Sequence, residues 1–140
     1  MKSLVILLLM SQVSFPTEKS YGKATVSKIV SVHDGDTFRA DMPKSWPPII
    51  GEGIEIRVRG IDTPELNDPR DSIRQISLKA KAFTDSVVKN AKKVVLTDMI
   101  RDKYFRINAF VIIDGKYSLS ELLIAKGLAR PYFGVGPKPW

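Results

Sequence analysis

Apolar and polar residues alternate with a period of two along much of the first half of the chain, which predicts strands. Residues 54–60 alternate most cleanly, with three β-branched residues on one face and a glutamate and two arginines on the other. Residues 24–32 alternate imperfectly but are rich in β-branched side chains, and residues 36–42 predict a second strand, joined to the first through an Asp-Gly-Asp turn. Three prolines and two glycines within residues 43–53 predict a loop.

The period changes to that of a helix over residues 72–92. Apolar side chains recur there every three or four positions, with lysines and an aspartate on the opposite side, which predicts one long amphipathic helix. Residues 93–98 and 107–113 predict two more strands, and the second is followed by an Asp-Gly-Lys sequence typical of a hairpin turn.

A short helix is predicted near the end of the chain. Ser118 and Glu121 match a capping box at its start, Gly127 matches the residue that ends it, and residues 128–132 predict a short strand. This order of elements favours a mainly β, α+β fold: a five-stranded Greek-key barrel of the OB type, with one long and one short helix packed outside. Such barrels commonly bind oligonucleotides or oligosaccharides.

The first residues have a different character from the rest. Residues 1–14 combine an early lysine, an apolar run and small residues, which is typical of a secretory signal peptide, and the apolar run is far too short to span a membrane. We therefore expect a secreted or periplasmic protein without a stable membrane anchor after processing. Residues 15–23 predict a linker, and residues 24–140 a single domain that, without cysteine, depends on its core alone.

Composition adds a preference for anionic partners. The 140 residues carry a formal net charge of +7 and a pI near 9.7, which favours binding to a polyanion. A nucleic acid and an anionic membrane surface both satisfy this condition.

Three clusters of charged residues lie at strand ends or in turns: residues 33–37, 57–65 and 101–106. If the barrel brings them together, three carboxylates meet two guanidinium groups. These are Asp36, Asp62, Glu65, Arg57 and Arg106.

Such a group would suit metal-assisted chemistry on a phosphodiester. Neighbouring carboxylates repel one another unless a cation neutralises them, and oxygen ligands without cysteine favour Ca²⁺ over zinc. Arg57 and Arg106 could clamp phosphate oxygens bidentately and stabilise the transition state. Glu65, after a proline that stiffens the turn, could take a proton from an attacking water.

Simpler interpretations exist for each of these residues. Asp-Gly-Asp-Thr is a common turn sequence, Asp62 and Thr63 could cap a turn, and Arg57 and Arg59 could be solvated residues on the outer face of a strand. For Arg59 we expect the solvated position. Asp102 could form a surface ion pair with little effect on stability.

His33 fits a strand-end surface position better than a catalytic one. Lys103 and Tyr104 are candidate substrate contacts, although the tyrosine could instead pack at the rim of the barrel.

The ordered set of motifs resembles the staphylococcal nuclease (thermonuclease) family. The resemblance covers most of the chain after the linker and rests on DGDT, an arginine before GIDTPE, AKAFT in the long helix, DKYFR, DGK and KGLARPY. It implies an OB-fold, calcium-dependent phosphodiesterase that acts on DNA and RNA with little sequence specificity. Cleavage on the 5′-oxygen side would leave 3′-phosphate ends.

The resemblance also implies roles for individual residues. Asp36 and Asp62 match calcium carboxylates, Thr63 matches a ligand through its backbone carbonyl, and Asp34 matches an acid near the metal. Glu65 matches the proposed general base. The phosphate-binding arginines match Arg57 and Arg106, and the contacts to a terminal phosphate match Lys103 and Tyr104.

The chain departs from the family's best-known member in several places. It stops soon after residue 131, where that member continues into a third helix, and Tyr132 and Phe133 are candidates for the residues that stack on a base. Phe105 stands where glycine is familiar, and the loop over residues 42–53 is longer and stiffer. We expect these departures to lie around the substrate groove.

Two other classes of function compete with the nuclease. A non-catalytic OB-fold module that binds nucleic acid or a protein would be expected to lack some of the residues named above. A polysaccharide-binding domain would be expected to carry aromatic platforms rather than a cluster of carboxylates. We expect a monomer that prefers single strands, because a splayed base can reach an aromatic rim.

Overall fold

The computed structural model describes residues 19–140. The signal peptide predicted for residues 1–14, and the first part of the predicted linker, lie outside the described residues. Within residues 19–140, no helix is long and apolar enough to cross a membrane.

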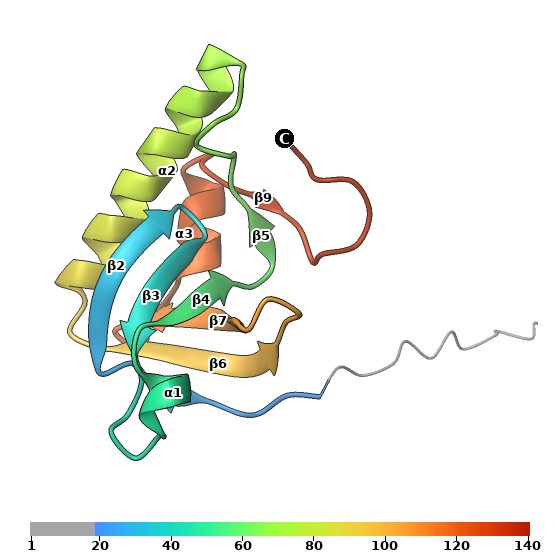
Figure 1. Ribbon diagram of the computed structural model, residues 1–140. Coiled ribbons are helices and arrows are strands. Elements are labelled where there is room, and N and C mark those ends of the chain that lie inside the picture. The colour runs from blue at the N-terminus through green and yellow to red at the C-terminus, as the bar shows by residue number, and fades with distance from the viewer. Residues whose placement is uncertain (1–18) are drawn as a thin grey trace, which may run out of the picture.

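Five longer strands form one curled mixed sheet (Figure 1). Two short strands also pair with it, one at an edge and one beside a central strand. β4 lies between β3 and β7 and is parallel to β7, whereas the other neighbours in this sheet are antiparallel. The spatial order is β1-β6-β7-β4-β3-β2, with β8 paired to β7. The strands are β1 (Ala24–Thr25), β2 (Lys28–Asp34), β3 (Thr37–Asp41), β4 (Ile54–Val58), β6 (Val94–Arg101), β7 (Ile107–Ile113) and β8 (Tyr117–Ser118).

The sheet curls because one chain segment pairs with both of its edges. β1 pairs with β6, and β2, only two residues further on, pairs with β3 at the other edge. Between them, the Val26 N–H donates to the carbonyl of Val94 and the Ser27 N–H donates to the carbonyl of Asp41. The predicted α+β fold of the OB type is therefore confirmed, as a curled half-barrel with helices outside.

Two helices cover the sheet from outside. α2 (Asp71–Asn90) packs along β2, and α3 (Leu119–Ala125) packs against β7. The long helix predicted for residues 72–92 is confirmed to within two residues at each end.

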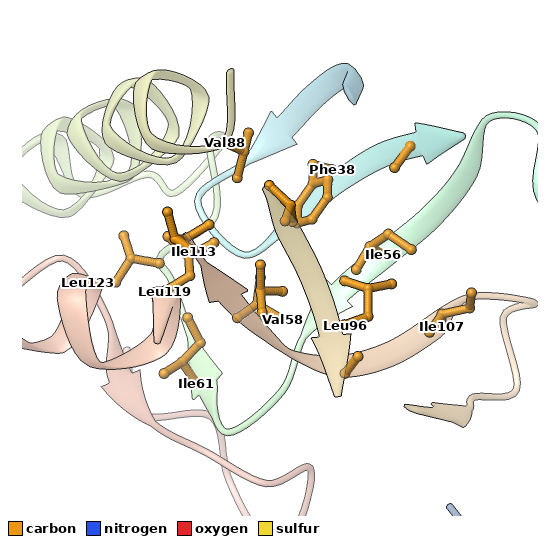
Figure 2. Close-up of a cluster of buried hydrophobic side chains, with 14 of the residues drawn as sticks. Phe38, Ile56, Val58, Ile61, Val88, Leu96, Ile107, Ile113, Leu119 and Leu123 are labelled. Atoms are coloured by element: carbon orange, nitrogen blue, oxygen red, sulfur yellow. The ribbon is translucent and has the colours of Figure 1, made fainter. Parts of the chain in front are cut away.

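The core lies between the curled sheet and these helices (Figure 2). Phe38, Ile56 and Leu96 come from three different strands and are fully buried, as is Leu123 from α3. Each such side chain contributes on the order of 1.5–3 kcal/mol by leaving water. Because alternate residues of β4 enter this core, the residues between them must face the other way.

Two local predictions need correction. The loop predicted for residues 43–53 contains a short helix, α1 (Pro48–Gly51), whose first position suits proline because the missing N–H would be unpaired there anyway. Ser118 precedes α3 as predicted, but its side chain makes no capping hydrogen bond. Instead the Ser120 hydroxyl donates to the carbonyl of Arg59, which ties α3 to the chain after β4. Gly127 does end the helix, with φ of +70°.

The last short strand, near the end of the chain, does not belong to the main sheet. β9 (Arg130–Pro131) pairs with β5 (Ile61–Asp62) in a separate two-stranded sheet. This pairing brings the end of the chain beside residues 61–63.

The turn between β2 and β3 is held against α2. A Cβ built at Gly35 would lie 2.6 Å from the Cβ of Ala80 and 2.9 Å from Cγ2 of Thr63, so only glycine allows the turn this close to the helix. The buried Thr84 hydroxyl donates to the Gly35 carbonyl at 2.6 Å. Helix α2 therefore fixes the position of the Asp-Gly-Asp turn.

We expect Thr84→Val to destabilise the protein by about 1–3 kcal/mol, because the isosteric change leaves the buried Gly35 carbonyl without a donor. Urea unfolding measures the difference. Thr84→Ser is the matched control, since it keeps the hydroxyl and removes one methyl group. If Thr84→Val were as stable as the wild type and Thr84→Ser were not, packing rather than the hydrogen bond would hold the turn.

Candidate active site

A cleft of about 830 Å³ opens where the β2–β3 turn, the end of β4 and the segment after β5 meet. It brings together most of the site residues expected from the sequence: Asp36, Arg57, Asp62, Thr63, Glu65, Tyr104, Arg106 and Tyr132. Lys103 does not line the cleft, and its ammonium lies 5.1 Å from the centre of the neighbouring Tyr104 ring. Residues 42–53 and Phe105 do not line it either, so the expectation that these two departures lie around the groove is wrong for their side chains, although Phe105 stands between two residues that do line it.

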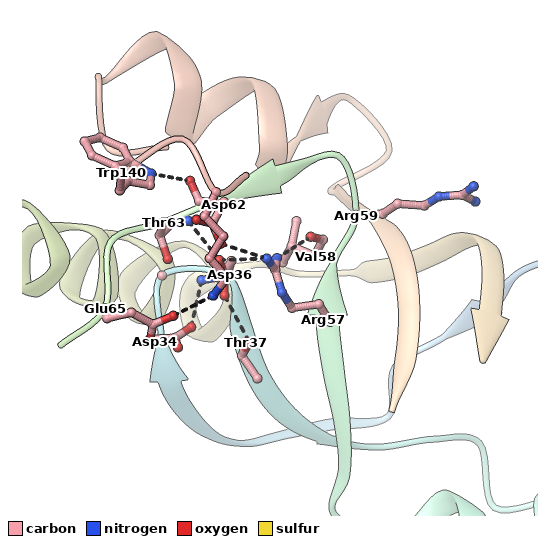
Figure 3. Close-up of polar contacts among 12 residues, drawn as sticks. Asp34, Asp36, Thr37, Arg57, Val58, Arg59, Asp62, Thr63, Glu65 and Trp140 are labelled. Carbon is pink, nitrogen blue, oxygen red and sulfur yellow. Dashed lines mark hydrogen bonds and ion pairs between the residues drawn. The ribbon is translucent and has the colours of Figure 1, made fainter. Parts of the chain in front are cut away.

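At the centre of the cleft, one arginine bridges two buried carboxylates (Figure 3). Nη2 of Arg57 lies 3.2 Å from Oδ2 of Asp36 and 3.2 Å from Oδ1 of Asp62. Nη1 of Arg57 donates to the Val58 carbonyl at 2.9 Å, which fixes the plane of the guanidinium. Arg57 faces the cleft because Ile56 and Val58, its neighbours in β4, face the core.

The carboxylate of Asp36 also connects two turns that are far apart in the sequence. Its Oδ1 accepts a bond from the Thr37 hydroxyl at 3.0 Å, and its Oδ2 accepts one from the Thr63 N–H at 2.9 Å. The Asp36 N–H donates to Oδ1 of Asp34, which closes the turn locally. DGDT and GIDTPE therefore form one structural unit.

Negative charge exceeds positive charge at this centre. Burial, followed by the nearby Asp36 carboxylate, raises the pKa of Asp34 to about 7. Burial and the same carboxylate also raise the pKa of Asp62, although Lys138 and Arg57 oppose the shift. One arginine does not fully offset three crowded acids, and an added cation would favour their ionised forms.

The chemistry of the donor atoms fits a hard divalent cation. Carboxylate oxygens of Asp36 and Asp62 and backbone carbonyls are the ligands that calcium prefers. The buried Thr63 hydroxyl oxygen has no hydrogen-bond partner within the described residues. Over residues 19–140, no three His, Asp or Glu side chains are grouped as a ready metal site, so carbonyl and water oxygens would have to complete the coordination.

Glu65 lies at the rim of the cleft, with more than half of its side chain exposed. Its Oε1 lies 2.9 Å from Nζ of Lys138, near the other end of the described chain. No hydrophobic periodicity indicates a role for Lys138, which lies in a Pro- and Gly-rich segment.

Arg106 is positioned by acids on two elements. Its Nε donates to Oδ2 of Asp102 at 2.6 Å, and its Nη1 lies 3.7 Å from Oε1 of Glu55. Oδ1 of Asp102 accepts the N–H groups of Tyr104 and Arg106 at 2.9 and 3.1 Å. Asp102 is thus more than a partner in a surface ion pair, because it holds the turn that presents Arg106.

Phe105, between these residues, has φ of +59°, in the left-handed region that favours glycine. Glycine adopts this conformation without strain, which fits the glycine that the family resemblance led us to expect at this position.

Two residues expected outside the site remain at its margin. Arg59 points away from the carboxylates in Figure 3, donates to the Asp98 carbonyl at 3.1 Å and lies 5.3 Å from the centre of the Phe110 ring. It also lines the cleft, so it is not simply a solvated residue. His33 is largely exposed, with Nε2 4.0 Å from Oδ2 of Asp34.

Trp140 is a site neighbour that sequence patterns did not indicate. Its indole Nε1 donates to the Asp62 carbonyl at 2.8 Å, and its ring lies 3.9 Å from the guanidinium carbon of Arg130. Tyr132, which also lines the cleft, donates its hydroxyl hydrogen to the carbonyl of Gly136.

Known proteins share this sequence pattern. The family described as "Staphylococcal nuclease homologue" matches residues 55–139. A thermonuclease of Staphylococcus hyicus is 30% identical over 138 aligned residues, which cover 92% of this chain and 77% of that protein. Endonuclease YncB of Bacillus subtilis is 30% identical over 124 residues, covering 87% of this chain and 55% of that protein. The chain belongs to the staphylococcal nuclease homologue family.

The chain covers a smaller share of a further relative. The SPbeta prophage-derived endonuclease YokF of Bacillus subtilis is 33% identical over 106 residues, covering 74% of this chain and 33% of that protein. The family resemblance inferred from the motifs is thereby confirmed.

We expect Ca²⁺ to raise the unfolding temperature of the wild type by about 5–10 °C at a hundred times its Kd, because a cation that binds only the folded state stabilises it by about 2.7 kcal/mol. Thermal unfolding in chelator and in rising Ca²⁺ measures the shift. In Asp62→Asn the shift should largely disappear, since one carboxylate ligand is lost. A wild-type unfolding temperature that does not move up to millimolar Ca²⁺ would count against a metal at this centre.

Proposed function

We propose that the protein is a calcium-dependent nuclease that hydrolyses the phosphodiester bonds of DNA and RNA with little sequence specificity, as both endonuclease and exonuclease, and leaves 3′-phosphate ends. Family membership and the nuclease names of three relatives support a hydrolytic nuclease. The observation that carries the proposal is the Arg57 guanidinium held between Asp36 and Asp62 in a cleft that also contains Glu65 and Arg106.

Asp36 and Asp62, with the backbone carbonyl of Thr63, would hold the calcium ion. When bound, the ion supplies positive charge and Lewis acidity beside the scissile phosphate. The carboxylates themselves are held in place by Arg57, Thr37 and the Thr63 N–H.

The two arginines bind the phosphate. Both stay charged at any working pH, and a planar fork matches two phosphate oxygens, so each can stabilise charge that develops in the transition state. Arg106 is oriented for this by Asp102 and Glu55. Glu65, at the open rim, accepts the proton of the attacking water.

The remaining contacts fix the nucleotide. Tyr104 lines the cleft and contacts the terminal phosphate, with Lys103 beside it from the same exposed turn. Tyr132 lies at the other side and offers a ring for stacking on a base, which favours single strands over duplex.

The setting proposed for this activity is outside the cytoplasm. The signal-like sequence of residues 1–14 supports secretion or export to the periplasm, without a membrane anchor after processing. The high positive charge supports association with extracellular nucleic acid, and we propose that the protein acts as a monomer.

The activity should require Ca²⁺ and the geometry of Arg57. We expect the wild type to degrade DNA and RNA in a gel assay, EDTA to abolish this, and Arg57→Lys to lower kcat by on the order of 10² or more, because lysine keeps the charge but loses the fork. Mass spectrometry of the products checks for 3′-phosphate ends. Tight binding without cleavage over hours would instead favour a non-catalytic OB-fold module, and full activity in Arg57→Lys would remove that residue from the mechanism.

Glu65→Gln should separate chemistry from binding. We expect kcat to fall by about 10²-fold or more, since the amide cannot take a proton, while the Kd for an oligonucleotide stays within a few fold. Single-turnover kinetics with fluorescence anisotropy measures both quantities. Equal losses in binding and turnover would show that Glu65 acts on substrate affinity and not as the base.

A further inference from the structure

The segment over residues 132–140 follows β9 at the end of the chain (Figure 1). Residues 132–135 and Lys138 of this segment line the cleft. The segment leaves β9 and returns toward the residues that follow β5. None of the roles proposed above for catalysis or metal binding uses its charged residue, Lys138.

Several contacts fasten this segment at both ends. The Tyr132 N–H donates to the Gly60 carbonyl at 3.0 Å, at the start. At the other end, the Trp140 indole donates to the Asp62 carbonyl (Figure 3), and Arg130 both stacks on the Trp140 ring and donates to the Pro139 carbonyl. Prolines on both sides of Lys138 restrict its backbone further. The position of Lys138 is therefore set by the fold.

Lys138 brings a cation to the acidic side of the cleft. Its Nζ lies 2.9 Å from Oε1 of Glu65, and the hydrogen bond to Glu65 and the charges of Glu65, Asp62 and Asp36 raise the pKa of the lysine. The side chain lines the cleft and is more than half exposed. It is thus charged, reachable from solvent, and close to the site where a phosphate would have to pass.

The ion pair between Lys138 and Glu65 is weak enough to be exchanged. Exposed ion pairs contribute about 0–1 kcal/mol, so Lys138 cannot hold Glu65 rigidly. A nucleic acid strand presents a phosphate for every nucleotide, and a cation that pairs with it also releases condensed counterions. The weak carboxylate partner can therefore be exchanged for a phosphate.

We propose that Lys138 is a phosphate-binding residue of the cleft, which pairs with Glu65 in the free protein and transfers to a substrate phosphate when a strand binds. The exchange joins two events: the strand gains a cationic contact, and the carboxylate of Glu65 loses its partner and can accept a proton from water. This inference rests on the proposed function, because it assigns a substrate contact within the same site.

Lys138→Gln in the full chain tests the inference. We expect KM for a single-stranded DNA substrate to rise by about 3–10-fold with kcat within about twofold of the wild type, and the slope of log Kd against log salt to fall by about 0.7, the value for one phosphate contact on a single strand. Lys138→Arg keeps the positive charge, so its KM and its salt slope should both stay close to those of the wild type. Lys116→Gln, which removes one exposed charge in the β7–β8 turn, is the matched control and should change neither.

The other outcomes would overturn the inference. A lower kcat with unchanged KM would make Lys138 a positioning residue for Glu65, and a higher kcat would make the ion pair autoinhibitory. Unchanged KM, kcat and salt slope would leave a surface ion pair without function. In each of these cases the wild type still cleaves, so the proposed nuclease would stand, whereas a wild type that neither cleaves nor binds DNA would refute the function itself.

Trp140→Phe tests the anchoring of the segment independently. It keeps a ring for Arg130 to stack on and removes the indole N–H that bonds to the Asp62 carbonyl. If the bond from Trp140 to the Asp62 carbonyl holds Lys138 in position, we expect Trp140→Phe to raise KM, as Lys138→Gln does. The double variant should then show little further increase in KM. Additive effects in the double variant would show that the two residues act separately.

Discussion

The carboxylate of Asp36 is the contact on which the whole cleft depends. It accepts the N–H of Thr63, the hydroxyl of Thr37 and the guanidinium of Arg57, so it joins two turns and a strand at one point. Breaking a buried pair of this kind typically costs 3–5 kcal/mol, because it leaves an uncompensated charge. The turn that carries Asp36 is in turn held by Thr84 and by the close approach of Gly35 to Ala80. A helix with no catalytic residue of its own thus determines where the central acid lies.

The same arrangement leaves the site electrostatically incomplete. The raised pKa values of Asp34 and Asp62 mean that ionising these two acids costs more free energy in the folded protein than in water, because of burial and the nearby Asp36 carboxylate. Folding energy from the hydrophobic core compensates for this cost, and a bound cation would relieve it. Crowded acids of this kind favour the binding of a cation, because a nearby positive charge stabilises their ionised forms.

Much of this could be predicted from sequence, because short motifs encode the local geometry. The alternation of residues 54–60 predicted that Arg57 faces away from the core, and the helical period of residues 72–92 predicted α2. The capping box predicted at Ser118 was wrong, since the Ser118 side chain makes no capping hydrogen bond. The side chain that bonds at the start of α3 is Ser120, whose partner is the carbonyl of Arg59, 61 residues away. Lys138, Trp140 and the role of Asp102 were missed for a similar reason. Their partners are set by tertiary contacts, which leave no periodic trace in the sequence.

The loop that contains α1 lies at the end of β3 and β4 that is remote from the cleft. Thr37 pairs with Arg57 near the acids, whereas Ala40 pairs with Ile54 at the loop end. Additional residues in such a loop cost little, since closure entropy grows slowly with length. The register between Thr37 and Arg57 tolerates no such change, because a shift by one residue would turn the arginine into the core. One hairpin therefore combines an end that tolerates insertions with an end that does not, and residues added to the exposed part of the loop would lie far from Arg57 and the acids.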